Sequence, residues 1–268
     1  DSSKGLTMNR IIQFQQKFSS QLKPNLLAIC SFCFLLLSNA QAGDLVLHLT
    51  FDKFSGPVIK DESGLGHDAT FNVQPRETKG PRGNQAAKLD GVSWGKVEDS
   101  DSLDLMEAFT IEAWTFISSD EKQIVVEKGA TWKRDGEYSL LFYEKRRPVI
   151  QAQDLPDNCD DEAVGDEIPR NTWIHLAGTW DGKVFKLYIN SELNVELECP
   201  GKLLKSQESL YIGSRGGGLR FLKGSIDDLR IYNYALGTKQ IRLDMENKLS
   251  ISRQGKVTTV WGRLKKRR

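Results

Sequence analysis

The sequence predicts an all-β fold, a two-sheet antiparallel sandwich or jelly roll with one short C-terminal helix. Short runs in which apolar and polar residues alternate recur through residues 43–246, and Gly-containing turn signals separate them. A period of two residues is typical of strands, and a helical period is convincing only near the end. Many short strands followed by a single helix favour a sandwich or jelly roll over an α/β fold.

The first strand is expected where Leu45, Leu47 and Leu49 occupy alternate positions. We expect strands at residues 45–51, 109–117, 123–126, 138–143, 149–152, 173–180, 184–189, 209–212 and 225–232. Several of these runs carry apolar residues at both kinds of position, which indicates burial between two layers or under loops. Between two of the runs, Asp181-Gly182 predicts a hairpin turn because this pair adopts positive φ at little cost.

A short helix is predicted near the end of the apolar pattern. Thr238 can cap it, and Ile241 and Met245 lie on one face at a spacing of four residues. The roughly 200 residues from Gly43 suit one sandwich, since all-β domains of this size commonly fold as a unit. We therefore expect one domain over residues 43–246.

Residues 1–42 have the pattern of an N-terminal extension followed by a cleavable signal peptide. Basic residues follow Met8, an uncharged apolar run spans 26–37, and Ala40-Gln41-Ala42 forms an A-x-A site that predicts cleavage after Ala42. The apolar run is shorter than the roughly 20 residues that span a bilayer. A membrane anchor and a lipoprotein modified at Cys30 are the alternatives. We place no functional expectation on residues 1–7.

The charge is divided unevenly along the chain. Residues 43–244 contain 25 Lys or Arg against 34 Asp or Glu, whereas 245–268 contain eight basic residues and the single acid Glu246. An acidic body argues against a nucleic-acid partner, and we expect no transmembrane span in the mature chain. Residues 247–268 are interpreted as a basic tail, either solvated or a tether to an anionic surface or partner.

The cysteines agree with export. Cys30 and Cys33 would leave with the signal, and the mature chain would keep Cys159 and Cys199 in an oxidising compartment. We expect these two to form a disulfide, which would contribute roughly 4 kcal/mol by closing a loop of about 40 residues. Two free thiols are the alternative. The predicted location is secreted, periplasmic or at the cell surface.

Seven segments together resemble a known family. They are LVLHLTFD (45–52), KDESGLGHDATF (60–71), AKLDG (87–91), FTIEAWTFI (109–117), WIHLAGTWDGKVFKLYINSEL (173–193), LYIG (210–213) and GSIDDLRIYNYAL (224–236). In this order they resemble laminin-G-like, pentraxin-like jelly-roll domains of the concanavalin A-like lectin and glucanase superfamily. The resemblance implies two antiparallel sheets packed face to face, a structural calcium near the chain ends, and a concave face or rim that binds glycans in many relatives.

A calcium site is expected from this resemblance. Ca²⁺ binds six to eight oxygens, and residues 61–70 offer carboxylates together with glycines that let backbone carbonyls turn inward. The resemblance implies Asp52 and Asp227 as the side-chain ligands. Carbonyls or side chains of residues 63–67, including Ser63, Gly66 and His67, would complete the shell. The alternative is that the acids near the first strand only cap turns and that Asp227 is a solvated strand residue.

No catalytic site is expected. Glucanase relatives carry acids at alternate positions of one strand, and retaining glycosidases need two carboxylates about 5 to 5.5 Å apart. Glu112 stands alone in its strand, and His48, His67 and His175 lack a Ser or Cys neighbour in a nucleophile motif. Glycoside hydrolase activity is therefore the least favoured function, and His175 is interpreted as a core or strand-pairing residue.

The predicted function is a secreted, non-catalytic module that binds carbohydrate and holds a structural calcium. Aromatic and Arg side chains in loops favour it, with Trp132 as the best candidate for an exposed ring, whereas Trp114, Trp173 and Trp180 match core positions of the family that the chain resembles. The alternative is an extracellular protein-interaction or adhesion domain, which the basic tail with Trp261 favours. A glycan or a cell-surface protein is accordingly the expected partner.

Overall fold

The structure, a computed structural model, describes residues 43–129, 137–153, 155 and 161–247. Contacts divide the chain into two units, Asp1–Ala42 and Gly43–Arg268, and every described residue belongs to the second. The predicted signal peptide and residues 248–268 of the predicted tail lie outside the described residues. In the described part of the chain, no helix has the length and apolar character required to cross a membrane.

Sheet A runs in the order β14-β13-β12-β7-β16-β5-β4, with β1 also pairing with β16. Its strands are β1 (Leu45–Leu49), β4 (Arg76–Lys79), β5 (Gln85–Asp90), β7 (Phe109–Ile117), β12 (Trp173–Trp180), β13 (Val184–Ile189), β14 (Glu192–Glu198) and β16 (Lys223–Tyr232). All of its pairs are antiparallel.

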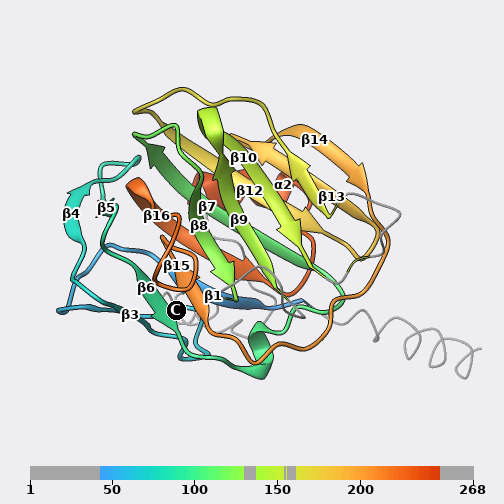
Figure 1. The fold of residues 1–268 in the computed structure, drawn as a ribbon, viewed down its shortest axis with the longest axis horizontal. Coiled ribbons are helices and arrows are strands. Elements are labelled where there is room, and N and C mark those ends of the chain that lie inside the picture. Colours follow the sequence, from blue (N-terminus) through green and yellow to red (C-terminus); the bar gives the residue numbers. More distant parts are fainter. Residues whose placement is uncertain (1–42, 130–136, 154, 156–160, 248–268) are drawn as a thin grey trace, which may run out of the picture. The chain divides into compact units, whose positions relative to one another are not determined.

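Sheet B runs in the order β11-β10-β9-β8-β15-β6-β3-β2 and is also antiparallel. Its strands are β2 (Val58–Ile59), β3 (Ala69–Phe71), β6 (Gly95–Val97), β8 (Gln123–Lys128), β9 (Tyr138–Tyr143), β10 (Arg147–Ala152), β11 (Glu162–Val164) and β15 (Leu210–Ile212). In Figure 1, β8, β9 and β10 cross in front of β7 and β12, so the two sheets form two layers. The predicted two-sheet jelly-roll sandwich is confirmed.

The predicted C-terminal helix is present as α2 (Thr238–Met245), and its N-cap is Gly237 rather than Thr238. No side chain caps its first turn. Ile241 of the helix packs with Tyr232, Tyr188 and Ala177 of sheet A, on the side away from sheet B. Two short 3-10 turns, Asp101–Leu103 and Glu144–Arg146, complete the regular structure.

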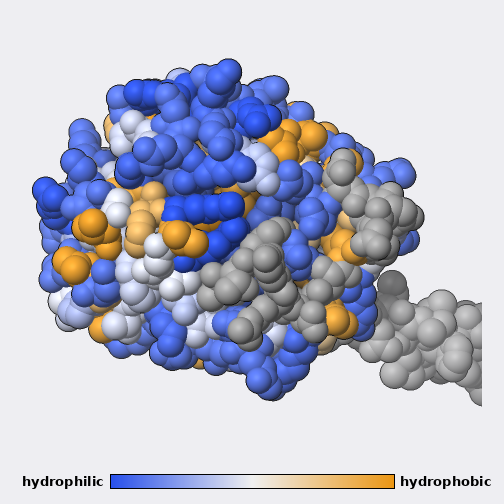
Figure 2. Space-filling model, viewed as in Figure 1, coloured by the Kyte–Doolittle hydropathy of each residue, from blue (hydrophilic) through white to orange (hydrophobic). Residues whose placement is uncertain are grey.

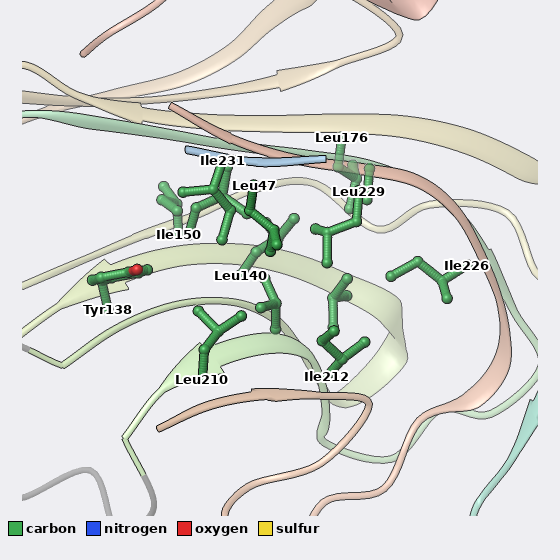
Figure 3. Packing of buried hydrophobic residues seen from close by; sticks show 14 of the residues in the cluster. Leu47, Tyr138, Leu140, Ile150, Leu176, Leu210, Ile212, Ile226, Leu229 and Ile231 are labelled. Atoms are coloured by element: carbon green, nitrogen blue, oxygen red, sulfur yellow. The ribbon is translucent and has the colours of Figure 1, made fainter. Parts of the chain in front are cut away.

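The hydrophobic core fills the space between the sheets. Figure 3 shows Leu176, Leu229 and Ile231 of sheet A facing Leu140, Leu210 and Ile212 of sheet B. All of these side chains are buried, and their alternate positions on each strand leave the intervening residues on the outer faces. Trp180 is fully buried in this core with Phe109 and Phe185, as the sequence predicted, whereas Trp114 and Trp173 are only partly buried.

Candidate functional site

A bulge in β16 brings the ends of several strands together. β5 pairs with Lys223–Ile226 and β1 pairs with Leu229–Tyr232, so both lie along the same edge of β16, on either side of Asp227 and Asp228. The register against β7 shifts between Asp227 and Arg230, and Asp228 has a φ of 53°. A bulge of this kind re-aims side chains. Here both acids contact polar groups of neighbouring segments rather than the core.

Asn84, just before β5, connects two predicted calcium ligands. Its Nδ2 donates to Asp52 Oδ1 at 2.9 Å and to Asp227 Oδ2 at 3.0 Å. Asp52 is exposed, whereas Asp227 is fully buried, and burial raises the pKa of Asp227 to about 7 although the Asn84 hydrogen bond opposes this. Gly80 allows this close approach, because a Cβ there would lie 2.5 Å from Asn84 Oδ1.

The donor set at this point fits a hard cation. Asn84 Oδ1 and Asp227 Oδ1 are buried and have no hydrogen-bond partner among the described residues. Carboxylate and amide oxygens are Ca²⁺ ligands, and a buried carboxylate with an open oxygen is stabilised by a bound cation. In the described part of the chain, no three His, Cys, Asp or Glu side chains gather as a metal cluster, so a cation here would also require amide, carbonyl or water oxygens. Asn84 was missed in the sequence because the calcium site was predicted from acidic residues and the segment 61–70, and Asn84 is an uncharged residue outside that segment.

The loop after β2 is organised by Asp61. Its carboxylate accepts hydrogen bonds from the backbone N–H groups of His48, Ser63 and His67 and from Ser63 Oγ. Burial raises the pKa of Asp61, but these hydrogen bonds outweigh burial and hold it below the usual value. Gly66 is exposed at φ 81°.

Asp52 and Asp227 are thus joined through Asn84, but the other predicted ligands have different partners. The Nε2 of His67 contacts Ser102 Oγ at 2.6 Å. Among the described residues, no hydrogen bond links Ser63 or His67 to Asp52 or Asp227. Participation of Ser63, Gly66 and His67 in a calcium shell therefore stays a prediction.

Asp228 joins four segments of the fold. It contacts His48 Nε2 of β1 at 2.7 Å, Arg82 of the β4–β5 loop at 2.7 Å and Arg230 of β16 at 2.8 Å. Arg82 and Arg230 also donate to the backbone carbonyls of Met245 and Asp244 in α2. Burial raises the pKa of Asp228, but the His48 hydrogen bond and the two cations hold it below its usual value.

A second candidate site lies on the outer face of sheet B. Residues that pair directly across neighbouring strands form one row, running Glu162, Gln151, Ser139, Glu127, Tyr211, Lys96 and Thr70. Their strand neighbours Ala163, Ile150, Leu140 and Leu210 belong to the core, so the row faces outward. Gln151, Ser139 and Glu127 are buried, whereas Tyr211 and Lys96 are partly exposed and Thr70 is exposed.

An aromatic pair adjoins the accessible part of this row. The rings of Trp94 and Tyr211 lie 5.9 Å apart between centroids, and both side chains are partly exposed. Trp94 is fixed by two backbone hydrogen bonds, one to the side chain and one to the backbone of Asn72. Gly217 has φ 74°, and a Cβ there would lie 2.7 Å from the Trp94 ring, so the glycine run allows its loop to pack against the indole.

The loop between β15 and β16 extends over the same row. Arg215 Nε donates to both carboxylate oxygens of Glu127, at 2.9 and 3.1 Å. Burial raises the pKa of Glu127 to about 7 even with Arg215 beside it. Backbone hydrogen bonds between Arg215 and Leu219 close the loop, and Arg220 follows with its carbonyl bound to the N–H of Ile124. Figure 2, in the orientation of Figure 1, shows hydrophobic and strongly hydrophilic residues next to one another near the middle of the visible face.

The remaining predicted residues have mixed outcomes. Trp132 and Cys159 lie outside the described residues, so neither the ring nor the disulfide is tested, and Cys199 is buried. His175 is buried in β12 with its ring 5.4 Å from Trp114 in an edge contact, as expected of a strand-pairing residue. Glu112 is buried opposite Ala177, with its Oε2 3.9 Å from His175 Nε2 and its Oε1 3.5 Å from Arg230 Nη1.

The two antiparallel sheets and their strand order define a jelly-roll module. Residues 89–242 match the Laminin_G_3 family model, described as the concanavalin A-like lectin/glucanases superfamily. The chain belongs to this family, as the seven segments indicated. No curated protein matches the chain significantly.

Solved structures share the fold at low sequence identity. The binding domain of Paraclostridial Mosquitocidal Protein 1 has a TM-score of 0.61 at 17% identity, covering 76% of this chain and 52% of that one. Domain 4 of AbnA, an extracellular arabinanase from Geobacillus stearothermophilus solved with arabinotriose, has a TM-score of 0.58 at 20% identity, covering 76% and 100%. The receptor binding domain of botulinum neurotoxin D has a TM-score of 0.55 at 16% identity, covering 77% and 53%. The chain therefore spans about half the length of the toxin domains and all of the arabinanase domain.

Proposed function

We propose that this protein is an exported, non-catalytic module that binds carbohydrate on the outer face of sheet B and holds a structural Ca²⁺ at Asp52, Asn84 and Asp227. The observation that carries the proposal is the row of polar side chains in which the partly exposed Tyr211 packs against the partly exposed ring of Trp94. Aromatic rings stack on the apolar faces of sugars, while amide, acidic and basic side chains bind hydroxyl groups. Similar structures include a domain solved with arabinotriose, which supports this choice of ligand class.

The accessible end of the row is the part where a sugar chain would bind. Glu127 and Ser139 are buried, whereas Thr70, Lys96, Tyr211 and Trp94 form a continuous partly exposed strip across β3, β6 and β15. Because hydrogen bonds to Asn72 already hold the backbone of Trp94, less conformational entropy is lost when a sugar stacks on its ring. A partly exposed strip of this kind is suited to the side or end of an oligosaccharide.

Calcium would act at a different place in the fold. The Asp52, Asn84 and Asp227 set joins the end of β1 to the start of β5 through the bulge of β16. A cation bound by the unpartnered oxygens of Asn84 and Asp227 would stabilise these parts of sheet A. It would not change the positions of Trp94 and Tyr211 on sheet B. We therefore propose a structural role for it.

A glycan array with and without calcium tests the function. We expect hits with both preparations and a higher melting temperature with calcium. An array without hits, measured on protein shown to be folded and monodisperse, would contradict carbohydrate binding. Hits that vanish in EDTA while the fold persists would contradict the structural role of the cation.

A protein partner is the second candidate. Val73, Val92 and Leu219 flank Trp94 on adjoining loops and are 55%, 60% and 63% exposed. Exposed apolar residues next to a Trp are typical of protein-binding surfaces. An empty glycan array combined with capture of a protein that is lost on Trp94→Ala would favour this function.

A further inference from the structure

Arg220 follows the glycine loop that packs against Trp94. Its backbone carbonyl accepts a hydrogen bond from Ile124 of β8 at 2.9 Å, and its φ of 49° turns the chain at the end of the glycine loop. A non-glycine residue at positive φ carries a conformational cost, so the surrounding structure imposes this position. The side chain is partly exposed.

The guanidinium of Arg220 differs from those of three buried arginines. Among the described residues, no hydrogen bond or ion pair engages it. By contrast, Arg215 binds Glu127, Arg146 binds Glu167, and Arg230 binds Asp228. Burial and the positive charge of Arg215 lower the pKa of Arg220, although the nearby Glu127, Tyr143 and Glu144 oppose this shift.

The surroundings of Arg220 are those of a binding strip. Arg215 lies beside it and binds Glu127, which pairs across β8 and β15 with Tyr211, the partner of Trp94. A partly desolvated guanidinium gains most from an anion, because charge-assisted and bidentate hydrogen bonds are about twice as strong as neutral ones. Oxyanions of carbohydrates are carboxylates and sulfate esters.

We propose that the ligand of this face is an acidic glycan whose carboxylate or sulfate binds Arg220 while a sugar ring stacks on Trp94 and Tyr211. This inference rests on the proposed carbohydrate binding and names its ligand class. Arg215 contributes positive potential but remains committed to Glu127.

The experiment uses pairs of oligosaccharides that differ only in charge. Titration calorimetry compares a galacturonate oligomer with its neutral methyl ester, and a sulfated oligomer with its desulfated form, so the two arms distinguish carboxylate from sulfate. Each pair is measured with calcium and with EDTA, because a bound cation could itself bind the carboxylate or sulfate of the oligosaccharide. We expect the charged member of at least one pair to bind about ten- to hundredfold more tightly, with a preference that weakens at high salt.

Three variants separate this role from a structural one. Arg220→Asn removes the charge but tolerates positive φ, Arg220→Lys keeps the charge without the planar fork, and Arg76→Asn alters an exposed Arg on β4 that pairs with Asp90. Arg220→Asn should abolish the preference at an unchanged melting temperature, Arg220→Lys should retain part of it, and Arg76→Asn should retain all of it.

Two results would overturn the inference. Equal binding of charged and neutral forms, or a preference that survives Arg220→Asn, would exclude Arg220 as the anion ligand and leave carbohydrate binding standing. Absence of binding to every form would overturn the acidic-glycan inference, whereas carbohydrate binding itself would be overturned only by an empty glycan array.

Discussion

The side-chain amide of Asn84 lies 3.0 Å from Asp227 Oδ2, although the two residues are 143 positions apart. The same amide also binds Asp52. The end of β1, the start of β5 and the bulge of β16 are therefore joined through one amide group, and one oxygen each of Asn84 and Asp227 is buried without a hydrogen-bond partner among the described residues.

Calcium should raise the melting temperature of the protein through this group. A ligand that binds only the folded state at 100 times its Kd stabilises by about 2.7 kcal/mol. Asp227→Asn should abolish the calcium response, yet leave stability in EDTA equal or higher, because it removes a buried carboxylate. Calorimetric melts of protein shown to start metal-loaded check this, with Asp90→Asn as a control for an exposed acid of the same sheet. An undiminished calcium response in Asp227→Asn would place the cation elsewhere.

Replacement of Asp228 by Asn should destabilise the fold strongly. It would leave Arg82 and Arg230 without their shared carboxylate and weaken the contact to His48. Loss of one partner from buried ion pairs costs about 3–5 kcal/mol, whereas the exposed pair of Asp90 with Arg76 is worth about 1 kcal/mol or less. Urea unfolding of Asp228→Asn and Asp90→Asn measures the difference. Equal losses would mean that the Asp228 contacts are energetically unimportant.

Stability should fall at acid pH partly through His175. Burial and the charge of Arg230 lower the pKa of this imidazole to about 3, whereas the unfolded chain keeps a value near 6.5. The unfolded state therefore binds more protons between these values, and the stabilisation present above pH 6.5 is lost as the pH falls towards 3.

The variant His175→Phe tests this titration. It keeps a ring against Trp114 and removes two buried nitrogens that have no hydrogen-bond partner among the described residues. We expect equal or higher stability at pH 7 and a smaller loss between pH 7 and pH 5, measured by urea midpoints. An unchanged pH slope would exclude His175 as a source of the acid sensitivity.

Strand positions followed largely from the sequence. The alternation in 109–117 and 173–180 predicted β7 and β12 with their observed bounds. β2 and β6 were missed because two or three residues are too short to show a period, and β14 was missed because its acid-rich edge resembles a loop. Trp114 and Trp173 were expected in the core, but their strand positions place them with Phe116 and His175 on the outer face of sheet A.

The candidate sites were less accessible to sequence reasoning. Asp52 and Asp227 were predicted together from the family resemblance. Asn84, which bridges them, was not predicted because its uncharged side chain does not stand out as a metal ligand. The row from Glu127 to Tyr211 depends on the register of β8 with β9 and β15. Pairing register between distant strands is set by the packed fold, so a spacing rule along the chain could not show it.

The predicted disulfide between Cys159 and Cys199 has a direct chemical test. Mass spectrometry of unreduced proteolytic peptides should recover the two cysteines cross-linked. Reduction should then lower stability by roughly 4 kcal/mol, the chain-entropy value for a loop of about 40 residues. Recovery of both cysteines as alkylated free thiols from non-reduced, freshly exported protein would contradict the pairing.

Carbohydrate binding at the Trp94–Tyr211 pair is tested most directly by comparing two tryptophan variants. Both Trp94 and Trp173 are partly exposed, but they lie on opposite sheets. Titration calorimetry with an oligosaccharide identified on the array should show binding at least about tenfold weaker for Trp94→Ala, since a stacked aromatic ring contributes about 1–3 kcal/mol. Trp173→Ala should bind like the unmodified protein. Unchanged affinity in a folded Trp94→Ala variant would contradict the proposed binding face.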